Sequence, residues 1–173
     1  VEWYSTCAKK VYPEFCTIRA FDIGSDKFAE GLPKEENPAL GVRGIRFLLK
    51  RKDLFKTQLR AIIRASKTKN VKLMLPMITN VSEVLQTKEL LEECKSELDQ
   101  EGFLYDPHLP FGIMIETPAS ALDIESFFEH CEFFSIGTND LTQYILASDR
   151  INEHVADIYD IFHPVVFKLI GTI

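Results

Sequence analysis

The stretch "FFSIGTNDLTQYILASDR", residues 133–150, has the order of a strand followed by a helix. Apolar residues run up to Gly137, three polar residues follow at positions 138–140, and the helix-like segment ends in Asp149 and Arg150. A strand that leads through a glycine into a helix is typical of the repeating unit of parallel α/β proteins. The polar residues at the tip of this strand would lie where such folds bind their ligands.

Three more apolar runs predict strands of the same kind. They are "CTIRAFDIG" (16–24), "VKLMLPMI" (71–78) and "FGIMIE" (111–116). A continuous apolar run suits a strand that is buried on both faces, as in parallel sheets covered by helices. Each run is separated from the next by enough residues for a helix.

Helical spacing fills the intervals between these strands. Residues 53–66 place apolar side chains on one helical face. A longer helix is predicted to begin at a cap on Asn80 or Ser82 and to end near residue 100. Alternating strands and helices predict a parallel α/β fold, and both an open doubly wound sheet and a barrel fit the pattern.

Bulk composition narrows the class of protein. The 173 residues are 46% hydrophobic and 27% charged, a balance normal for a globular protein with a core. The net charge of -6 argues against a nucleic-acid binder, which is usually basic. No apolar run approaches the roughly 18 residues that cross a bilayer, so no membrane insertion is expected. The four cysteines show neither a CxxC pair nor zinc spacing, which predicts reduced thiols and a cytoplasmic location.

Two carboxylates stand at predicted strand ends. Glu116 ends the run 111–116, and Asp140 follows the strand of the opening stretch. If these strands are neighbours in a parallel sheet, the two side chains lie on strands roughly 5 Å apart. That spacing suits a hard divalent cation such as Mg²⁺, which takes oxygen ligands and keeps waters. Arg19 in the run 16–24 and Arg43 after "ALG" would supply planar guanidinium groups, which bind phosphate or carboxylate through pairs of hydrogen bonds.

Each of these residues also has a purely structural interpretation. A strand-end arginine can simply pair with an acid, and Asp140 can cap a helix that begins at Leu141. Their coincidence at the ends of neighbouring strands instead indicates a metal-assisted site for a small anionic molecule, such as a phosphorylated one. The pattern by itself does not choose the reaction.

Six segments of the chain resemble one known family. They are "IRAFDIGSDK" (18–27), "LPKEENPALGVRGIR" (32–46), "QLRAIIRAS" (58–66), "LMLPMI" (73–78), "IMIETPAS" (113–120) and the opening stretch. Together they are similar to the C-terminal, phosphoenolpyruvate-binding barrel of enzyme I of the bacterial sugar phosphotransferase system, the phosphoenolpyruvate–protein phosphotransferases. Phosphoenolpyruvate synthase and pyruvate phosphate dikinase have a similarly built site and are the alternative enzymes. The alternative that is not an enzyme is a non-catalytic phosphoenolpyruvate-binding module.

The resemblance implies part of a (β/α)8 TIM barrel of the phosphoenolpyruvate/pyruvate type. About five of its eight βα units would be present, with the first strand and the last two strands missing. Residues 1–173 would then be a single partial domain. Because the chain begins at Val1 and not at a methionine, we expect it to be a piece of a longer protein.

The resemblance also implies a role for individual residues. Glu116 and Asp140 match the two ligands of Mg²⁺, the cofactor. The matches to residues that bind phosphoenolpyruvate are Arg19, Arg43, Asn139 and Arg150. No catalytic residue is expected in the chain, because the general-acid cysteine and the phosphorylated histidine of the family belong to segments that it does not match.

The activity implied is Mg²⁺-dependent phosphoryl transfer from phosphoenolpyruvate to a histidine of the same protein, which leaves pyruvate. The phosphoryl group then passes to the carrier protein HPr, bound by an N-terminal region outside this chain, and starts sugar uptake. The family implies a homodimer for the whole protein. Without the remaining strands, we expect this chain to be inactive alone.

Overall fold

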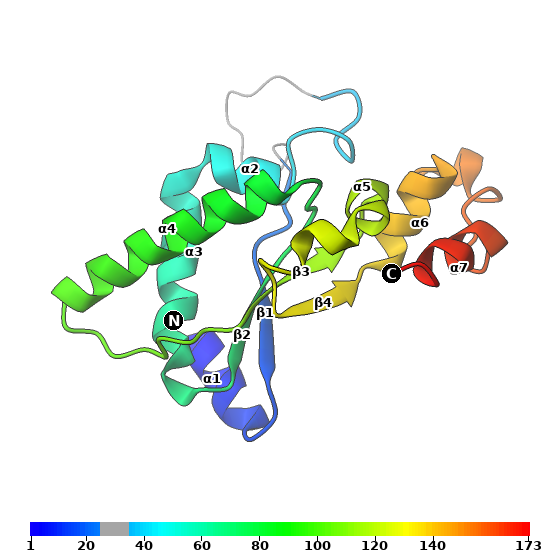
Figure 1. Ribbon diagram of the computed structural model, residues 1–173. Coiled ribbons are helices and arrows are strands. Elements are labelled where there is room, and N and C mark those ends of the chain that lie inside the picture. Colours follow the sequence, from blue (N-terminus) through cyan, green and yellow to red (C-terminus); the bar gives the residue numbers. More distant parts are fainter. Residues whose placement is uncertain (25–34) are drawn as a thin grey trace.

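The predicted apolar runs form the strands of one parallel sheet. The computed structural model describes residues 1–24 and 35–173, and its sheet contains four strands (Figure 1). The last residues of each run, which the sequence placed in the strands, lie in loops beyond the carboxyl ends of the strands. The strands are β1 (Cys16–Arg19), β2 (Val71–Leu75), β3 (Phe111–Ile115) and β4 (Phe133–Ile136).

The order of the strands is that of a barrel segment, one of the two architectures that the alternation left open. Neighbours in the sheet follow the chain order β1-β2-β3-β4, and every pair is parallel. Because such crossovers are right-handed, an order that never reverses places successive crossovers on the same face, as in a barrel. A doubly wound sheet would reverse its order at a switch point.

The α/β class is therefore confirmed, with a difference in extent. The described residues form four strands, fewer than the about five βα units that the resemblance implied. In this part of the chain the sheet is open, with β1 and β4 at its edges.

The two faces of β2 differ in what covers them. Leu73 and Leu75 point to one face and are fully buried in the main core. Lys72 points to the other face, where its Nζ lies 4.0 Å from the ring centroid of Phe15 and 5.2 Å from that of Phe133. Its ammonium group is therefore held by cation–π contacts on this second face.

The two long helices that the spacing predicted are confirmed. They are α3 (Lys52–Ala65) and α4 (Val81–Gln100), which lie side by side (Figure 1). Asn80, not Ser82, is the N-cap of α4, and it forms a reciprocal capping box with Glu83. This box satisfies two backbone donors at the start of the helix. The apolar face of α3 is fully buried at Leu59, Ile62 and Ile63.

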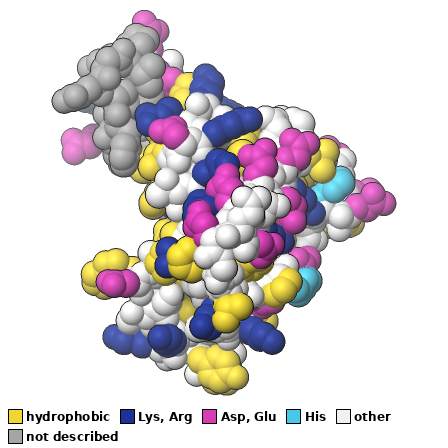
Figure 2. All heavy atoms as spheres, turned by 90° about the vertical axis from the view of Figure 1, so that its left-hand side faces the viewer, with side chains coloured by type: hydrophobic (Ala, Val, Ile, Leu, Met, Phe, Trp, Pro, Cys, Tyr) yellow, Lys and Arg dark blue, Asp and Glu magenta, His cyan; other side chains and the backbone are white. Residues whose placement is uncertain are grey.

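The outer face of α3 and α4 carries interleaved charges (Figure 2). Lys56 pairs with Glu97, and Arg60 pairs with Glu97 at 2.9 Å and with Glu101 at 2.6 Å. Basic side chains of α3 thus have carboxylate partners on α4 and at its C-cap. This face differs from the single-sign basic surface typical of a nucleic-acid binder.

Shorter elements complete the described chain, and α5, α6 and α7 lie beside β3 and β4, at the right of Figure 1. Within the described ranges, no helix combines the length and apolar character needed to cross a bilayer. The four cysteines are free thiols. These elements are α1 (Glu2–Val11), α2 (Ile45–Lys50), η2 (Ser66–Thr68), α5 (Pro118–Leu122), η3 (Ile124–Phe127), α6 (Thr138–Leu146), η4 (Glu153–Val155) and α7 (Pro164–Ile170).

Truncation of a core side chain on β2 tests this packing. We expect Leu73→Ala to lower the free energy of unfolding by about 3 kcal/mol, because it removes buried methyl groups and leaves a cavity. Leu122→Ala is the matched control, at a position that is 77% exposed, and should change the free energy by less than about 0.5 kcal/mol. Urea unfolding followed by circular dichroism measures both, and equal losses would contradict the packing described.

Candidate functional site

The polar residues predicted from the sequence converge beyond the carboxyl ends of the strands. Arg19 is the last residue of β1, Glu116 follows β3 directly, and Asp140 lies in the first turn of α6, after β4. A cavity of about 440 Å³ opens there, and Arg19, Arg43 and Arg150 are among the residues that line it. Three of the four predicted substrate-binding residues therefore border one cavity.

Arg43 lies at the centre of this group. Its Nε and Nη2 donate to the two carboxylate oxygens of Asp22, at 3.2 and 2.8 Å, and its Nη1 donates to Oδ1 of Asp140 at 2.9 Å. Burial alone would lower the pKa of Arg43, but the hydrogen bonds and negative charges of Asp22 and Asp140 outweigh it and raise the pKa. Arg43 is therefore a permanent, fixed cation of the site.

Asp22 is a member of the site that the sequence reasoning missed. Its side chain is 6% exposed and bridges two arginines, because Oδ2 also accepts from Nη1 of Arg19 at 3.3 Å. A signal was present in the sequence: Asp22 stands in the quoted segment "IRAFDIG", at the end of a predicted strand. Ser25, Asp26 and Lys27 of the same segment lie outside the described residues.

The other two predicted substrate-binding residues differ in their placement. Arg150 borders the cavity, and its Nη1 lies 3.5 Å from Oδ2 of Asp140. Asn139 is exposed and is not among the residues that line the cavity, and its backbone oxygen accepts from the hydroxyl of Tyr159 at 3.2 Å. The role of Asn139 stays a prediction.

The capping interpretation of Asp140 is wrong. The helix α6 begins at Thr138 rather than at Leu141, with Gly137 as the N-cap and no side-chain cap. Asp140 is buried in the first helical turn, and its carboxylate contacts Arg43 and Arg150.

Glu116 is the most deeply buried acid of the group, at 1% exposure. Its Oε1 accepts one hydrogen bond, from the backbone N–H of Met77 at 2.6 Å. Burial raises the pKa of Glu116 to about 7, against the opposing hydrogen bond of Met77 and with the help of the nearby charges of Asp140 and Asp22. The carboxyl group thus changes its charge near neutral pH.

Side chains from several elements hold the turn between β2 and α4. Met77 has a φ of 58°, a left-handed conformation that is strained for a residue with a side chain. This backbone directs the N–H of Met77 at Glu116. The next backbone groups are also bonded: Ile78 O accepts from Thr117 Oγ1 at 2.7 Å, and Thr79 N donates to Glu83 at 2.7 Å.

Gly137 is required by the close approach of Glu116. A Cβ atom at position 137 would lie 2.7 Å from Cβ of Glu116 and 2.8 Å from its Oε2. The glycine after β4 therefore makes room for a carboxylate on the neighbouring strand end. The sequence pattern indicated the glycine but not this reason for it.

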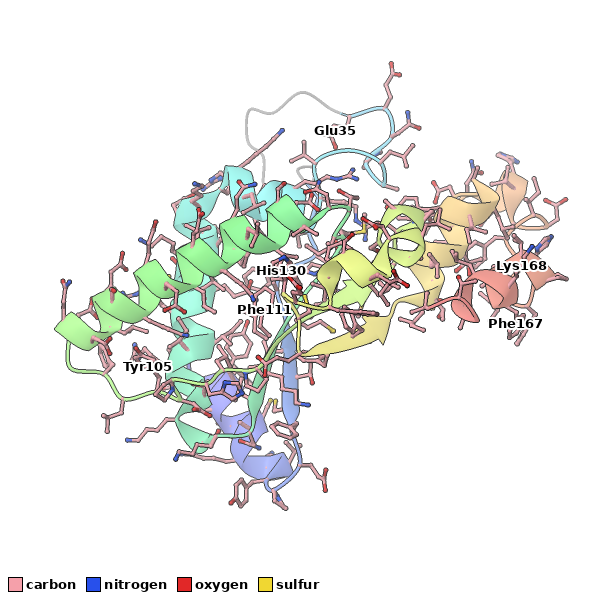
Figure 3. The ribbon with its side chains drawn as sticks, viewed as in Figure 1. Glu35, Tyr105, Phe111, His130, Phe167 and Lys168 are labelled. Carbon is pink, nitrogen blue, oxygen red and sulfur yellow. The ribbon has the colours of Figure 1, made fainter. Side chains whose placement is uncertain are left out.

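A loop from the N-terminal half borders the same cavity. Glu35 lies beyond the carboxyl ends of the strands (Figure 3), and its two carboxylate oxygens accept from the N–H of Val42 at 3.0 and 3.2 Å. Pro38 and Ala39 of this loop line the cavity. The hydroxyl of Tyr144, on α6, donates to the backbone oxygen of Ala39. The loop is thus fastened to α6.

The acidic residues fit a magnesium ion that takes only one or two ligands from the protein. Oε2 of Glu116 accepts no hydrogen bond from the described residues, so it is free to ligate. Across residues 1–24 and 35–173, no three His, Cys, Asp or Glu side chains group as a metal site. Mg²⁺ is commonly held by one or two carboxylates, with waters and substrate phosphates completing its shell. Glu116 and Asp140 match that smaller donor set.

Comparison with known families identifies the chain. The family model described as "PEP-utilising enzyme, PEP-binding domain", where PEP is phosphoenolpyruvate, matches residues 1–173. The chain belongs to this family. The resemblance stated from the sequence motifs is thereby confirmed.

Curated relatives of this PEP-binding domain are much longer proteins. The Phosphoenolpyruvate-protein phosphotransferase of Priestia megaterium is 44% identical over 172 residues, which are 98% of this chain and 30% of that protein. The protein of the same name from Mycoplasma capricolum is 47% identical over 155 residues, 88% of this chain and 27% of that protein. A Multiphosphoryl transfer protein of Xanthomonas campestris pv. campestris is 49% identical over 156 residues, 88% of this chain and 18% of that protein. The chain spans less than a third of the length of these relatives.

The buried Glu116 makes the stability of this PEP-binding domain depend on pH. Its pKa rises from the ordinary 4.5 to about 7 on folding, so the folded state binds the proton more tightly and becomes less stable as pH rises from 4.5 to 7. Glu116→Gln keeps the acceptor for Met77 and removes the charge. We expect the variant to exceed the wild type in free energy of unfolding by roughly 3 kcal/mol at pH 8 and by less than about 1 kcal/mol at pH 5. Urea unfolding at both values checks this, and a difference independent of pH would contradict it.

The contact between Gly137 and Glu116 predicts the effect of a single methyl group. We expect Gly137→Ala to lower the free energy of unfolding by about 2 kcal/mol, because the new Cβ overlaps Glu116. Gly171→Ala is the matched control, since a Cβ there would meet its nearest atom, Phe167 O, at an ordinary 3.4 Å. In urea unfolding, equal effects of the two substitutions would show that Glu116 does not lie against Gly137.

Proposed function

We propose that this chain is the PEP-binding part of a phosphoenolpyruvate–protein phosphotransferase. It would hold PEP while the phosphoryl group passes to a histidine elsewhere in the same protein. The observation that carries the proposal is the grouping of Arg19, Arg43 and Arg150 around one cavity at the carboxyl ends of the strands. The names of the relatives favour this reaction over those of a PEP synthase or a pyruvate phosphate dikinase.

The charges of the site suit PEP, which carries a carboxylate and a phosphate. Guanidinium groups bind both with pairs of parallel hydrogen bonds. Three guanidinium groups stand around the cavity, while two carboxylates, Asp22 and Asp140, pair with them. Asp149 also lines the cavity, so three aspartates balance the three guanidinium charges, and a bound Mg²⁺ would supply the excess positive charge for the anionic ligand. Asn139 would contact the phosphate only if its side chain turned toward the cavity.

Glu116 and Asp140 would hold Mg²⁺. When bound, the ion would offset negative charge on the phosphoryl group during transfer. Above about pH 7 Glu116 has lost its proton and presents an anionic oxygen. The arginines would orient PEP for in-line transfer, and fixed positive groups of this kind stabilise charge that develops in the reaction.

The remaining steps belong to the whole protein. They are protonation of the product to pyruvate, formation of the phosphohistidine and transfer to HPr at the start of sugar uptake. A homodimer in the cytoplasm is the assembly that we propose for it. This chain would contribute PEP binding and orientation, and we propose that it does not turn over alone.

Ligand-dependent melting tests the proposal. A ligand at 100 times its Kd stabilises a fold by about 2.7 kcal/mol, which corresponds to roughly 5–10 °C for a chain of this size. We expect Mg²⁺ and PEP together to raise the melting midpoint by this amount, and Mg²⁺ alone to raise it little. Asp140→Asn should abolish the rise, because it removes both a metal ligand and a charge that holds Arg43.

The matched control is Asp53→Asn. Asp53 also pairs with an arginine, Arg51, but its side chain is 68% exposed, lies on α3 and is not among the residues that line the cavity. This variant should keep the full ligand-dependent rise. A rise that survives Asp140→Asn, or no rise in the wild type, would overturn the proposed site.

A further inference from the structure

The hydroxyl of Tyr144 joins separate parts of the cavity wall. Tyr144 lies on α6 one helical turn after Asp140 and therefore on the same face. Its Oη accepts a hydrogen bond from Nη1 of Arg43 at 3.2 Å and donates to the backbone oxygen of Ala39. A tyrosine hydroxyl both donates and accepts, so the two bonds form together.

The bonds of Arg43 leave little freedom to its guanidinium. The group carries five N–H donors. Asp22 accepts from Nε and Nη2, while Asp140 and Tyr144 accept from Nη1. Among the described residues, these contacts engage all donors except one N–H on Nη2. That N–H is held in a fixed direction and is available to a ligand.

Tyr144 differs from the other partners of Arg43 in being neutral. Asp140 serves two purposes in the proposed site, because it pairs with Arg43 and would also ligate Mg²⁺. A divalent cation competes with a guanidinium for the same carboxylate. The hydroxyl of Tyr144 is not subject to this competition and keeps Nη1 in place.

The same hydroxyl couples Arg43 to the loop 35–42. Ala39 lines the cavity and is bonded to Tyr144, while Glu35 and Val42 close the loop on itself. Loss of the hydroxyl would leave the oxygen of Ala39 and one N–H of Arg43 without these partners. The guanidinium of Arg43 would then lose its link to the middle of the loop, which stays bonded to Arg46 through the oxygen of Leu40.

We propose that Tyr144 is a positioning residue, which holds Arg43 and the loop 35–42 in the geometry that binds the phosphate of PEP. The inference rests on the proposed function for its ligand, and on the contacts of Tyr144 alone for its effect on Arg43. The substitution that isolates it is Tyr144→Phe, which removes the hydroxyl and keeps the ring. Tyr105→Phe is the matched control, because that hydroxyl donates to Asp99 at 3.0 Å and lies far from the cavity (Figure 3).

The first measurement needs no ligand. In nitrogen-15 NMR of the chain, slow rotation of a guanidinium gives separate Nη signals. We expect separate signals for Arg43 in all three proteins, because Asp22 and Asp140 still hold the group, but a shifted Nη1 signal with faster proton exchange in Tyr144→Phe alone, where one Nη1 bond is gone. Unchanged Arg43 signals in Tyr144→Phe would overturn the inference. A loss of stability alone would not produce this change.

The second measurement is calorimetric titration with PEP in the presence of Mg²⁺. We expect Tyr144→Phe to bind PEP about tenfold more weakly than the wild type, because a hydrogen bond to a charged group is lost. Tyr105→Phe should bind like the wild type. Equal affinity in Tyr144→Phe and the wild type would overturn the role in binding. If the wild type itself does not bind PEP, the proposed function fails, and the NMR signals of Arg43 still decide whether Tyr144 positions it.

Discussion

A buried guanidinium between two aspartates fixes the geometry at the carboxyl end of the sheet. Arg43 is 12% exposed at its side chain, while Asp22 and Asp140 are 6% and 8% exposed. The three residues come from the exit of β1, a turn before α2 and the start of α6, so one side chain joins distant parts of the sequence. Removal of one partner of a buried pair leaves an uncompensated charge and costs about 3–5 kcal/mol. The positions of the other arginines and of the cavity depend on this arrangement.

Glu116 shows what happens to a buried acid that lacks such partners. Asp22 and Asp140 receive hydrogen bonds from arginines, whereas Glu116 receives one from a backbone N–H. Burial dominates at Glu116, and its pKa rises to about 7. The site therefore combines a group of permanent charges with one carboxyl whose desolvation is not offset by the chain. A bound cation is the natural source of that compensation.

Local features of the fold could be read from the sequence, and pairings between distant residues could not. The strands and the cap at Asn80 follow from apolar runs and from residue types at helix starts, which act over a few neighbours. Asp22 stands at a strand end, but its pairing with Arg43 could not be predicted, because the two are 21 positions apart and no local pattern links them. Alternation of strands and helices did not distinguish a barrel from a doubly wound sheet, because it does not fix the strand order. The site residues were predicted from their residue types and from their positions at the ends of strands. The exposure of Asn139 could not be predicted in this way, because it depends on how α6 begins after Gly137.

The turn between β2 and α4 has a consequence for the dynamics of the molecule. The backbone groups of Met77, Ile78 and Thr79 are bonded to side chains of Glu116, Thr117 and Glu83, which lie on or next to other elements. Loops of this kind usually exchange their amide hydrogens quickly. Because both amides are hydrogen-bonded to side chains, we expect those of Met77 and Thr79 to exchange slowly, as in a strand, and this part of the site to be ordered before a ligand arrives. The entropy lost on binding is correspondingly small, and it falls mainly on the ligand rather than on this turn.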